Sequence, residues 1–125
     1  MKKSSLTFFI LFLALILAGN AKGADLLLGS WTFTINQAPW EYSRGTLIIE
    51  LNKEKAPVGK MLFQGGGQVD LSSIIEKDKK YTLNIIIQEY TLSTIVEIKD
   101  DVLTGYVQLP DGNLPFNATK VVPEN

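Results

Sequence analysis

Apolar residues recur at every second position over most of the chain beyond residue 24, in short runs separated by turn-rich or charged clusters. Successive side chains of a β-strand point to opposite faces, so this period of two predicts strands that are buried on one face. No helical period appears in this part of the chain, which predicts an all-β domain. We expect eight strands, at residues 29–35, 46–51, 58–64, 69–75, 81–87, 91–98, 102–109 and 114–121.

The connections between these runs are short, such as Lys99-Asp100-Asp101. Consecutive strands are therefore expected to pair as antiparallel hairpins. Eight strands that meander in this way can close into a barrel, which leaves no exposed sheet edge. The predicted fold is an eight-stranded antiparallel up-and-down β-barrel, and a two-sheet sandwich with the same meander is the alternative.

Alternation also predicts which side chains face the interior, and almost all of them are large and apolar. Their burial, at about 25 cal/mol per Å² of apolar surface, is ample for a domain without disulfides. Few of these positions can form a hydrogen bond with a ligand, so the pattern disfavours a polar cavity. The predicted inward residues are Trp31, Phe33, Ile35, Leu47, Ile49, Leu51, Met61, Phe63, Leu71, Leu83, Ile85, Leu92, Val96, Leu103, Val107, Leu114 and Phe116.

Residues 1–23 have a different pattern, in which two lysines near the start are followed by an apolar run and then by small residues. This order is typical of a secretory signal peptide, and the apolar run is shorter than the roughly 20 residues that a membrane span needs. We predict cleavage near Gly23–Ala24 and export to the periplasm or the medium. The mature protein would be one barrel domain, residues 24–125, without a membrane span. An uncleaved N-terminal anchor is the alternative.

The chain contains no histidine and no cysteine. Their absence excludes Ser/His catalytic groups, histidine or thiolate metal sites and thiol redox chemistry, and we predict neither a metal nor a cofactor. Removal of the signal peptide would take away Lys2, Lys3 and Lys22 and change the net charge from −1 to −4. Such an acidic domain lacks the basic surface that nucleic acid binding requires.

The loops of an up-and-down barrel alternate between its two ends, and here the two sets differ in composition. The second, fourth and sixth connections are mixed-charge turns, which are typical of solvated surface. The other set gathers aromatic and amide side chains with few charges, and barrel mouths commonly hold ligand sites. Candidate ligand-binding residues at this end are Trp40, Tyr42, Gln64, Gln68, Glu89, Tyr90 and Asn113. The alternative is that Trp40 and Tyr42 form a lid that seals the core.

A triple glycine, Gly65–Gly67, lies in one of these loops. No Gly-Lys-Ser/Thr follows it and no helix is predicted after it, so it lacks the features of a phosphate-binding loop. We predict a hairpin turn instead.

Three loop acids, Glu41, Glu89 and Asp111, also belong to this end. A pair of carboxylates is what a glycosidase requires. Loop acids are expected in any domain of this size, so we predict a protein without catalytic residues that is not an enzyme. A glycosidase that uses Glu41 and Glu89 is the alternative.

The Gly-x-Trp motif at Gly29-Ser30-Trp31, at the start of the first strand, resembles the calycin group, which includes lipocalins and avidins. In lipocalins the tryptophan closes the barrel floor and packs against a basic side chain from the last strand. The resemblance implies that Lys120 stands in the place of this basic side chain. No lipocalin-type helix follows the eighth run and the biotin-binding residues of avidins do not align, so neither biotin nor retinoid binding is implied.

A second likeness covers nearly all of the mature chain. The segments that carry it are Gly29-Ser-Trp-Thr-Phe, Pro39, Gly45-Thr-Leu, Leu103-Thr-Gly-Tyr-Val and Gly112-Asn-Leu-Pro-Phe-Asn-Ala-Thr. They are similar to small exported calycin-like β-domains of Bacteroidetes. That group offers no ligand or catalytic residues to transfer, so the resemblance implies the fold only.

Together these observations predict a binding module of the cell envelope that holds an apolar small molecule or lipid at the barrel end carrying Trp40. The alternative is a protein-interaction or protease-inhibitor domain. In that case the extended N-terminal segment, residues 24–28, would contact the protease.

Overall fold

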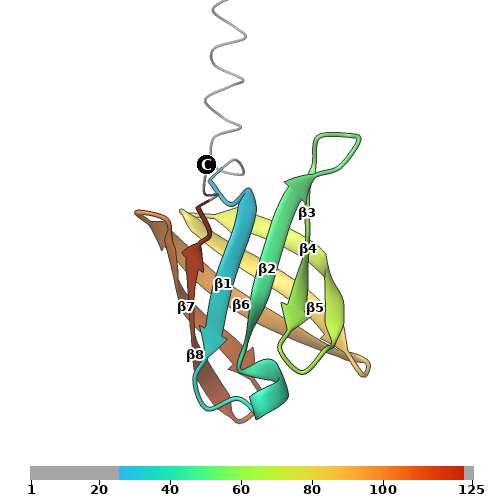
Figure 1. Ribbon diagram of the computed structural model, residues 1–125, viewed down its shortest axis with the longest axis vertical. Helices are drawn as coiled ribbons and strands as arrows, with labels where there is room; N and C mark the ends of the chain where they lie inside the picture. Colours follow the sequence, from blue (N-terminus) through green and yellow to red (C-terminus); the bar gives the residue numbers. More distant parts are fainter. Residues whose placement is uncertain (1–25, 123–125) are drawn as a thin grey trace, which may run out of the picture.

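The computed structural model describes residues 26–122, which form one closed antiparallel β-barrel (Figure 1). The strands follow one another around the barrel in chain order, and the last pairs with the first from Trp31↔Lys120 to Ile35↔Phe116. This closure confirms the predicted up-and-down barrel and excludes the sandwich. The strands are β1 (Gly29–Ile35), β2 (Arg44–Leu51), β3 (Pro57–Phe63), β4 (Gln68–Lys77), β5 (Lys80–Ile87), β6 (Tyr90–Lys99), β7 (Val102–Leu109) and β8 (Gly112–Lys120).

A short 3₁₀ helix, η1 (Trp40–Tyr42), lies between β1 and β2. The described residues contain no helix with the length and apolarity that a membrane crossing requires. The predicted signal peptide and its cleavage site lie outside the described residues.

Several turns are tighter than the sequence predicted. The β4–β5, β5–β6 and β6–β7 hairpins turn at Asp78–Lys79, Gln88–Glu89 and Asp100–Asp101, and each of these residues has a positive φ. Positive φ at both central residues defines type I′ turns, whose twist matches that of the flanking strands. Strand pairing therefore continues into Tyr90 in β6, a residue assigned to a loop from the sequence. In the β7–β8 hairpin, pairing likewise includes Asn113 in β8.

The floor of the barrel is filled around Trp31, which is completely buried. Its Nε1 donates a hydrogen bond of 2.8 Å to the carbonyl oxygen of Leu27, which is also completely buried. The Lys120 Nζ lies 5.6 Å from the centre of the Trp31 ring. This contact confirms the tryptophan–lysine pair that the calycin resemblance implied, and it adds a cation–π attraction to the floor.

Phenylalanines pack in the middle of the barrel. The ring of Phe33 stacks on Phe116 at a centroid distance of 5.6 Å and meets Phe63 edge-on at 5.7 Å. Offset-stacked and edge-on geometries both suit the charge distribution of aromatic rings. These rings close off the filled floor from the other half of the interior.

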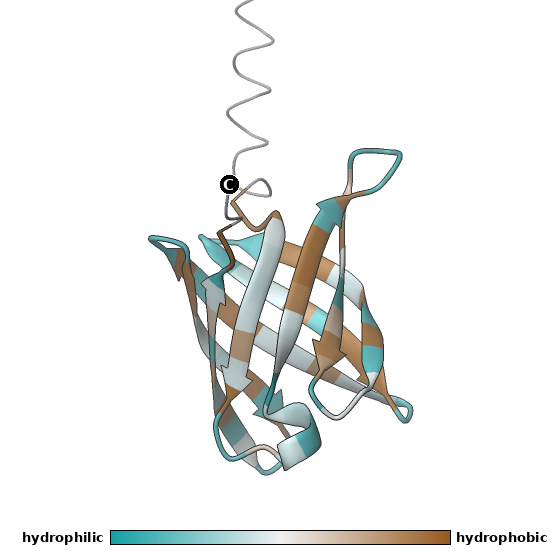
Figure 2. Ribbon diagram, viewed as in Figure 1, coloured by the Kyte–Doolittle hydropathy of each residue, from teal (hydrophilic) through white to brown (hydrophobic). Residues whose placement is uncertain are grey.

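All but one of the predicted inward side chains are buried in the core or pack against it, and Figure 2 shows the alternation of hydropathy along the strands. Four further residues are buried that were not predicted to face inward: Leu27, Tyr81, Thr94 and Ala118. Leu51 was predicted to face the core but is 42 % exposed. It is the last residue of β2, opposite Pro57, in a hairpin that projects beyond the barrel (Figure 1). No neighbouring strand covers a side chain there, so alternation alone placed it wrongly.

Candidate functional site

The two sets of loops lie at opposite ends of the barrel, as predicted (Figure 1). We call one of them the η1 end. It carries η1 and the turns at residues 64–67, 88–89 and 110–111. The other end carries the charged turns and the Trp31 floor.

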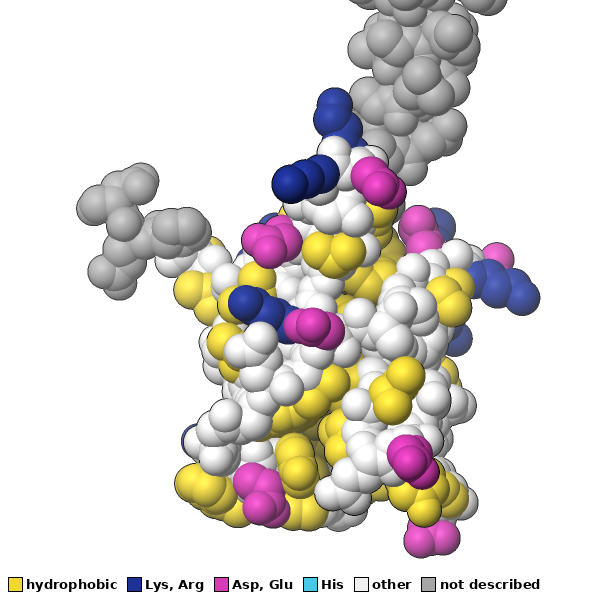
Figure 3. Space-filling view, turned by 90° about the vertical axis from the view of Figure 1, so that its right-hand side faces the viewer, with side chains coloured by type: hydrophobic (Ala, Val, Ile, Leu, Met, Phe, Trp, Pro, Cys, Tyr) yellow, Lys and Arg dark blue, Asp and Glu magenta, His cyan; other side chains and the backbone are white. Residues whose placement is uncertain are grey.

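A cavity of about 260 Å³ opens at the η1 end. The least exposed of its lining residues are Met61, Ile85, Thr94 and Val107. Its mouth is formed by the ends of the strands and by the loop that carries η1. Figure 3 views the barrel from the β4–β5 side and shows apolar side chains inside a hollow toward this end.

The cavity exists because the two halves of the interior receive side chains of different size. The floor half holds the large buried side chains of Trp31, Phe33 and Phe116, and the rings of the two phenylalanines stack on each other. The η1 half receives mainly aliphatic side chains such as Ile85 and Leu114, which leave the centre open. The barrel is therefore filled at one end and hollow at the other.

Polar groups are few in the cavity wall, and no charged side chain of the described residues lines it. Gln88 and Tyr42 contribute to the mouth, whereas Thr94 lies inside at 3 % exposure. Among residues 26–122 the Thr94 hydroxyl forms no hydrogen bond. In the same residues, every side-chain nitrogen or oxygen that is fully shielded from solvent has a hydrogen-bond partner. The Thr94 hydroxyl therefore keeps its accessible surface within the cavity.

The η1 loop is held over the barrel by the β3–β4 turn. Gln64 Nε2 donates hydrogen bonds to the Trp40 carbonyl oxygen at 2.6 Å and to Ser43 Oγ at 3.2 Å. The Gly65 amide donates to the Glu41 carbonyl oxygen at 3.3 Å. A Cβ at Gly65 would lie 2.5 Å from Glu41 Cβ. The predicted hairpin turn at the triple glycine is confirmed, and its first glycine also permits this close approach.

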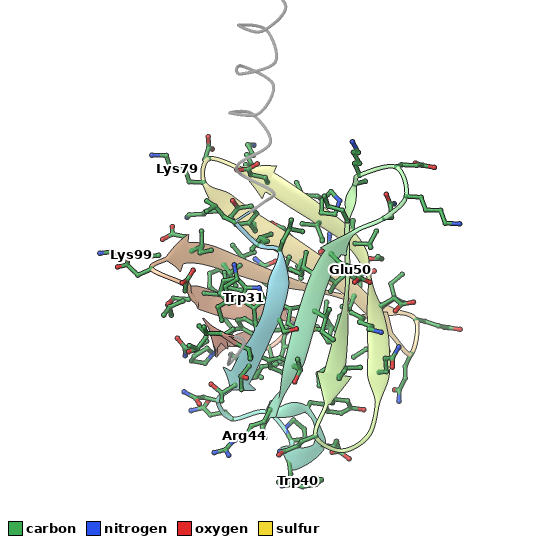
Figure 4. The ribbon with its side chains drawn as sticks, turned by 45° about the horizontal axis from the view of Figure 1, so that its top comes forward. Trp31, Trp40, Arg44, Glu50, Lys79 and Lys99 are labelled. Carbon is green, nitrogen blue, oxygen red and sulfur yellow. The ribbon has the colours of Figure 1, made fainter. Side chains whose placement is uncertain are left out.

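Tyr42 is the candidate residue that lines the cavity. Its ring meets Phe63 edge-on at a centroid distance of 5.1 Å, so it covers part of the mouth. Trp40 is 70 % exposed and lies at the tip of η1, outside the barrel (Figure 4). Of the predicted lid, only the Tyr42 half covers the core.

The other candidate residues lie around the mouth and do not line the cavity. Gln64 positions η1, as described above. Tyr90 is 70 % exposed, and the remaining three are exposed on strand ends or turns: Gln68, Glu89 and Asn113.

Sequence reasoning missed two polar residues of the cavity, Thr94 and Gln88. Thr94 could have been found, because it alternates with the inward residues Leu92 and Val96. Gln88 could not, because its contribution to the mouth depends on how the β5–β6 turn folds.

A second hollow, of about 370 Å³, lies on the outer surface where β3 and β4 separate. These strands pair only from Lys60↔Asp70 to Leu62↔Gln68, the shortest ladder in the barrel. The wall of this hollow includes the charged residues Glu50, Lys60 and Asp70. An open, charged groove of this kind lacks the enclosed apolar surface of the cavity.

Tyr81 is a buried ionisable group at the opposite end, where it pairs with Glu76 across β4 and β5. Burial raises the pKa of the Tyr81 phenol, and the negative charge and hydrogen bond of the Glu76 carboxylate raise it further. The phenol therefore donates to the carboxylate and stays neutral at physiological pH. This pair belongs to the floor and not to the cavity.

No protein-family model and no curated protein sequence matches this chain. Among solved structures, it is similar to a mutant of the fluorescent protein UnaG, with a TM-score of 0.50 and 13 % identity over 79 % of this chain and 99 % of that one. A second UnaG mutant gives a TM-score of 0.49 and 16 % identity over 76 % and 96 % of the two chains. A redesigned β-barrel gives 0.49 and 12 % over 80 % and 96 %. At such identities the first likeness shows the fold, a calycin-like barrel, and nothing more.

Proposed function

We propose that this protein is a non-enzymatic, exported binding protein that holds an apolar small molecule or lipid in the cavity at the η1 end. The observation that carries the proposal is the cavity itself, about 260 Å³ of space lined almost entirely by aliphatic and aromatic side chains. A well-formed apolar pocket with a few polar groups is the usual form of a small-molecule site.

The size of the cavity limits the ligand. Engineered apolar cavities of about 150 Å³ bind benzene, and a water-sized group occupies about 30 Å³. A volume of about 260 Å³ thus accommodates on the order of nine non-hydrogen atoms. A longer ligand would extend through the mouth past Tyr42.

Burial of the ligand's apolar surface would drive binding. Each buried methylene contributes about 0.8 kcal/mol, and loss of the ligand's translational and rotational freedom opposes this gain by several kcal/mol. A ligand that fills the cavity gains enough to bind, whereas a much smaller one does not. Shape and filling, more than charge, would therefore select the ligand.

Export is supported by the order of basic, apolar and small segments in residues 1–23. The protease-inhibitor alternative would need a free N-terminal segment. Leu27, near the end of that segment, is completely buried in the barrel floor and accepts the Trp31 hydrogen bond. This anchoring favours the binding protein over the inhibitor.

Native mass spectrometry of the protein purified from its own host tests the proposal, with a second spectrum after denaturing extraction. We expect an additional mass that is lost on denaturation and belongs to an apolar compound. A cavity-filling variant, Leu114→Trp, should carry less of it, whereas Val58→Trp on the outer surface should carry the same amount. A compound retained equally by both variants would place binding elsewhere and contradict the proposal.

A further inference from the structure

We infer that the ligand of the cavity is an uncharged molecule with one hydrogen-bonding group at its inner end, which pairs with the hydroxyl of Thr94. This inference rests on the proposed function and specifies its ligand class. It starts from the contrast between Thr94 and the other least exposed lining residues of the cavity, since Met61, Ile85 and Val107 are apolar.

Among residues 26–122, Thr94 is the buried polar residue of the barrel interior. Thr94 is 3 % exposed, and within the described residues its hydroxyl has no hydrogen bond. The hydroxyl keeps accessible surface in the cavity, so its partner must come from whatever occupies the cavity. Most buried polar groups in proteins are paired, and a ligand with a hydrogen-bonding group can supply this partner.

Water is a poor substitute for such a ligand. A buried water needs two to four polar partners, typically about three. Around Thr94 the neighbouring cavity side chains are aliphatic, and the other polar side chains of the wall, Tyr42 and Gln88, belong to the mouth. A single hydroxyl does not hold a water there as firmly as a ligand whose apolar part fills the remaining space.

The same wall excludes a charged group. No lysine or arginine of the described chain lines the cavity. Arg44, at the η1 end, is exposed and points away from the interior (Figure 4). A carboxylate placed beside Thr94 would lose its hydration without gaining a counter-ion, which is far more costly than burial of a neutral hydroxyl.

Polar groups at the mouth do not impose the same requirement. Tyr42 is 36 % exposed, and Gln88 is also exposed in the β5–β6 turn, so water satisfies both. A ligand gains little by pairing with them, whereas pairing with Thr94 replaces no bulk water. The inner end of the ligand therefore carries its polar atom, and its outer end is apolar or reaches solvent.

Isothermal titration calorimetry at pH 7 tests this with three compounds of similar size: toluene, p-cresol and 4-methylbenzoate. The proteins are the wild type, Thr94→Val, which keeps the shape and removes the hydroxyl, and Thr94→Ser, which restores it. We expect the wild type to bind toluene and p-cresol, and 4-methylbenzoate at least a hundredfold more weakly than p-cresol. Thr94→Val should weaken p-cresol about tenfold and leave toluene within twofold, because only p-cresol loses a hydrogen bond. Thr94→Ser should bind p-cresol like the wild type.

The outcomes separate this inference from the proposed function. If toluene binds but Thr94→Val changes both neutral compounds equally, or 4-methylbenzoate binds as tightly as p-cresol, the ligand class is wrong and the apolar site stands. If none of the three compounds binds to the wild type, the proposed function fails, and the ligand class fails with it.

Discussion

The side-chain amide of Gln64 donates a hydrogen bond of 2.6 Å to the carbonyl oxygen of Trp40. This bond joins the β3–β4 turn to η1, and η1 carries Tyr42 at the mouth of the cavity. The geometry of the mouth thus depends on a contact between two loops that are distant in sequence.

Replacement of Gln64 by alanine should loosen η1. Because this hydrogen bond is exposed, we expect a loss of about 0.5–1 kcal/mol in the free energy of unfolding. The Tyr42 and Ser43 amides, which donate within the same turn, should exchange with solvent faster. Hydrogen exchange and urea denaturation measure both effects. Gln68→Ala is the matched control and should change neither. Slow exchange of these amides in Gln64→Ala would show that other contacts hold the loop.

The two aromatic residues of η1 should contribute differently to binding. Tyr42 lines the cavity and packs on Phe63, whereas Trp40 is 70 % exposed. We expect Tyr42→Ala to weaken toluene binding severalfold, because the ligand loses a buried contact, and Trp40→Ala to leave it within twofold. Calorimetric titration of both variants measures this. Equal effects of the two substitutions would mean that the ligand contacts the outer rim.

Gly105 in β7 should tolerate no side chain. A Cβ at this position would lie 1.8 Å from the carbonyl oxygen of Ile95 in the neighbouring strand. We expect Gly105→Ala to destabilise the barrel by about 3 kcal/mol, because backbone atoms must shift. The control is Gly67→Ala, whose Cβ would meet its nearest neighbour at 3.9 Å and should change stability by less than about 0.5 kcal/mol. Similar unfolding midpoints for the two variants would contradict this account.

Tyr81 makes stability depend on pH in the alkaline range. Its pKa is raised above the ordinary value of 10.0, mainly by burial and further by Glu76. The folded state therefore favours the protonated phenol, and the stabilisation is complete below pH 10 and decreases as the pH rises through the folded pKa. Glu76→Gln should lower this pKa without returning it to 10.0, because burial persists. Ultraviolet titration of the phenol measures the shift. A pKa unchanged by Glu76→Gln would show that burial alone is responsible.

Much of the fold is predictable because a period of two specifies both the strands and their buried faces. Closure of the barrel is favoured, because it leaves no edge strand with unpaired backbone N–H and C=O groups. It is the observed pairing of β1 with β8 that excludes the sandwich. The exact turns do not follow, because Gln88 and Glu89 adopt positive φ without the Gly or Asn that signals a type I′ turn. The period of two gave a strand that begins at residue 91 and so placed Tyr90 in a loop, whereas the tight turn places it in β6.

The candidate site was predictable only in part. Loop composition identified the correct end of the barrel and Tyr42. It also favoured exposed aromatic residues such as Trp40 over residues whose side chains face the interior. Thr94 lay on a strand whose alternation already directed it inward. Whether the interior around it is hollow depends on side-chain volumes summed over several strands, which no single segment of the sequence reveals.

Methyl NMR of the protein during a titration with toluene tests the central claim most directly. The cavity predicts saturable shifts of the methyl groups of Ile35, Ile85 and Leu114, which line it, and unchanged signals from Ile49 and Leu103 in the filled floor. Absence of saturable shifts at the cavity methyls, or shifts confined to the floor or outer surface, would contradict the claim that this end of the barrel is the binding site.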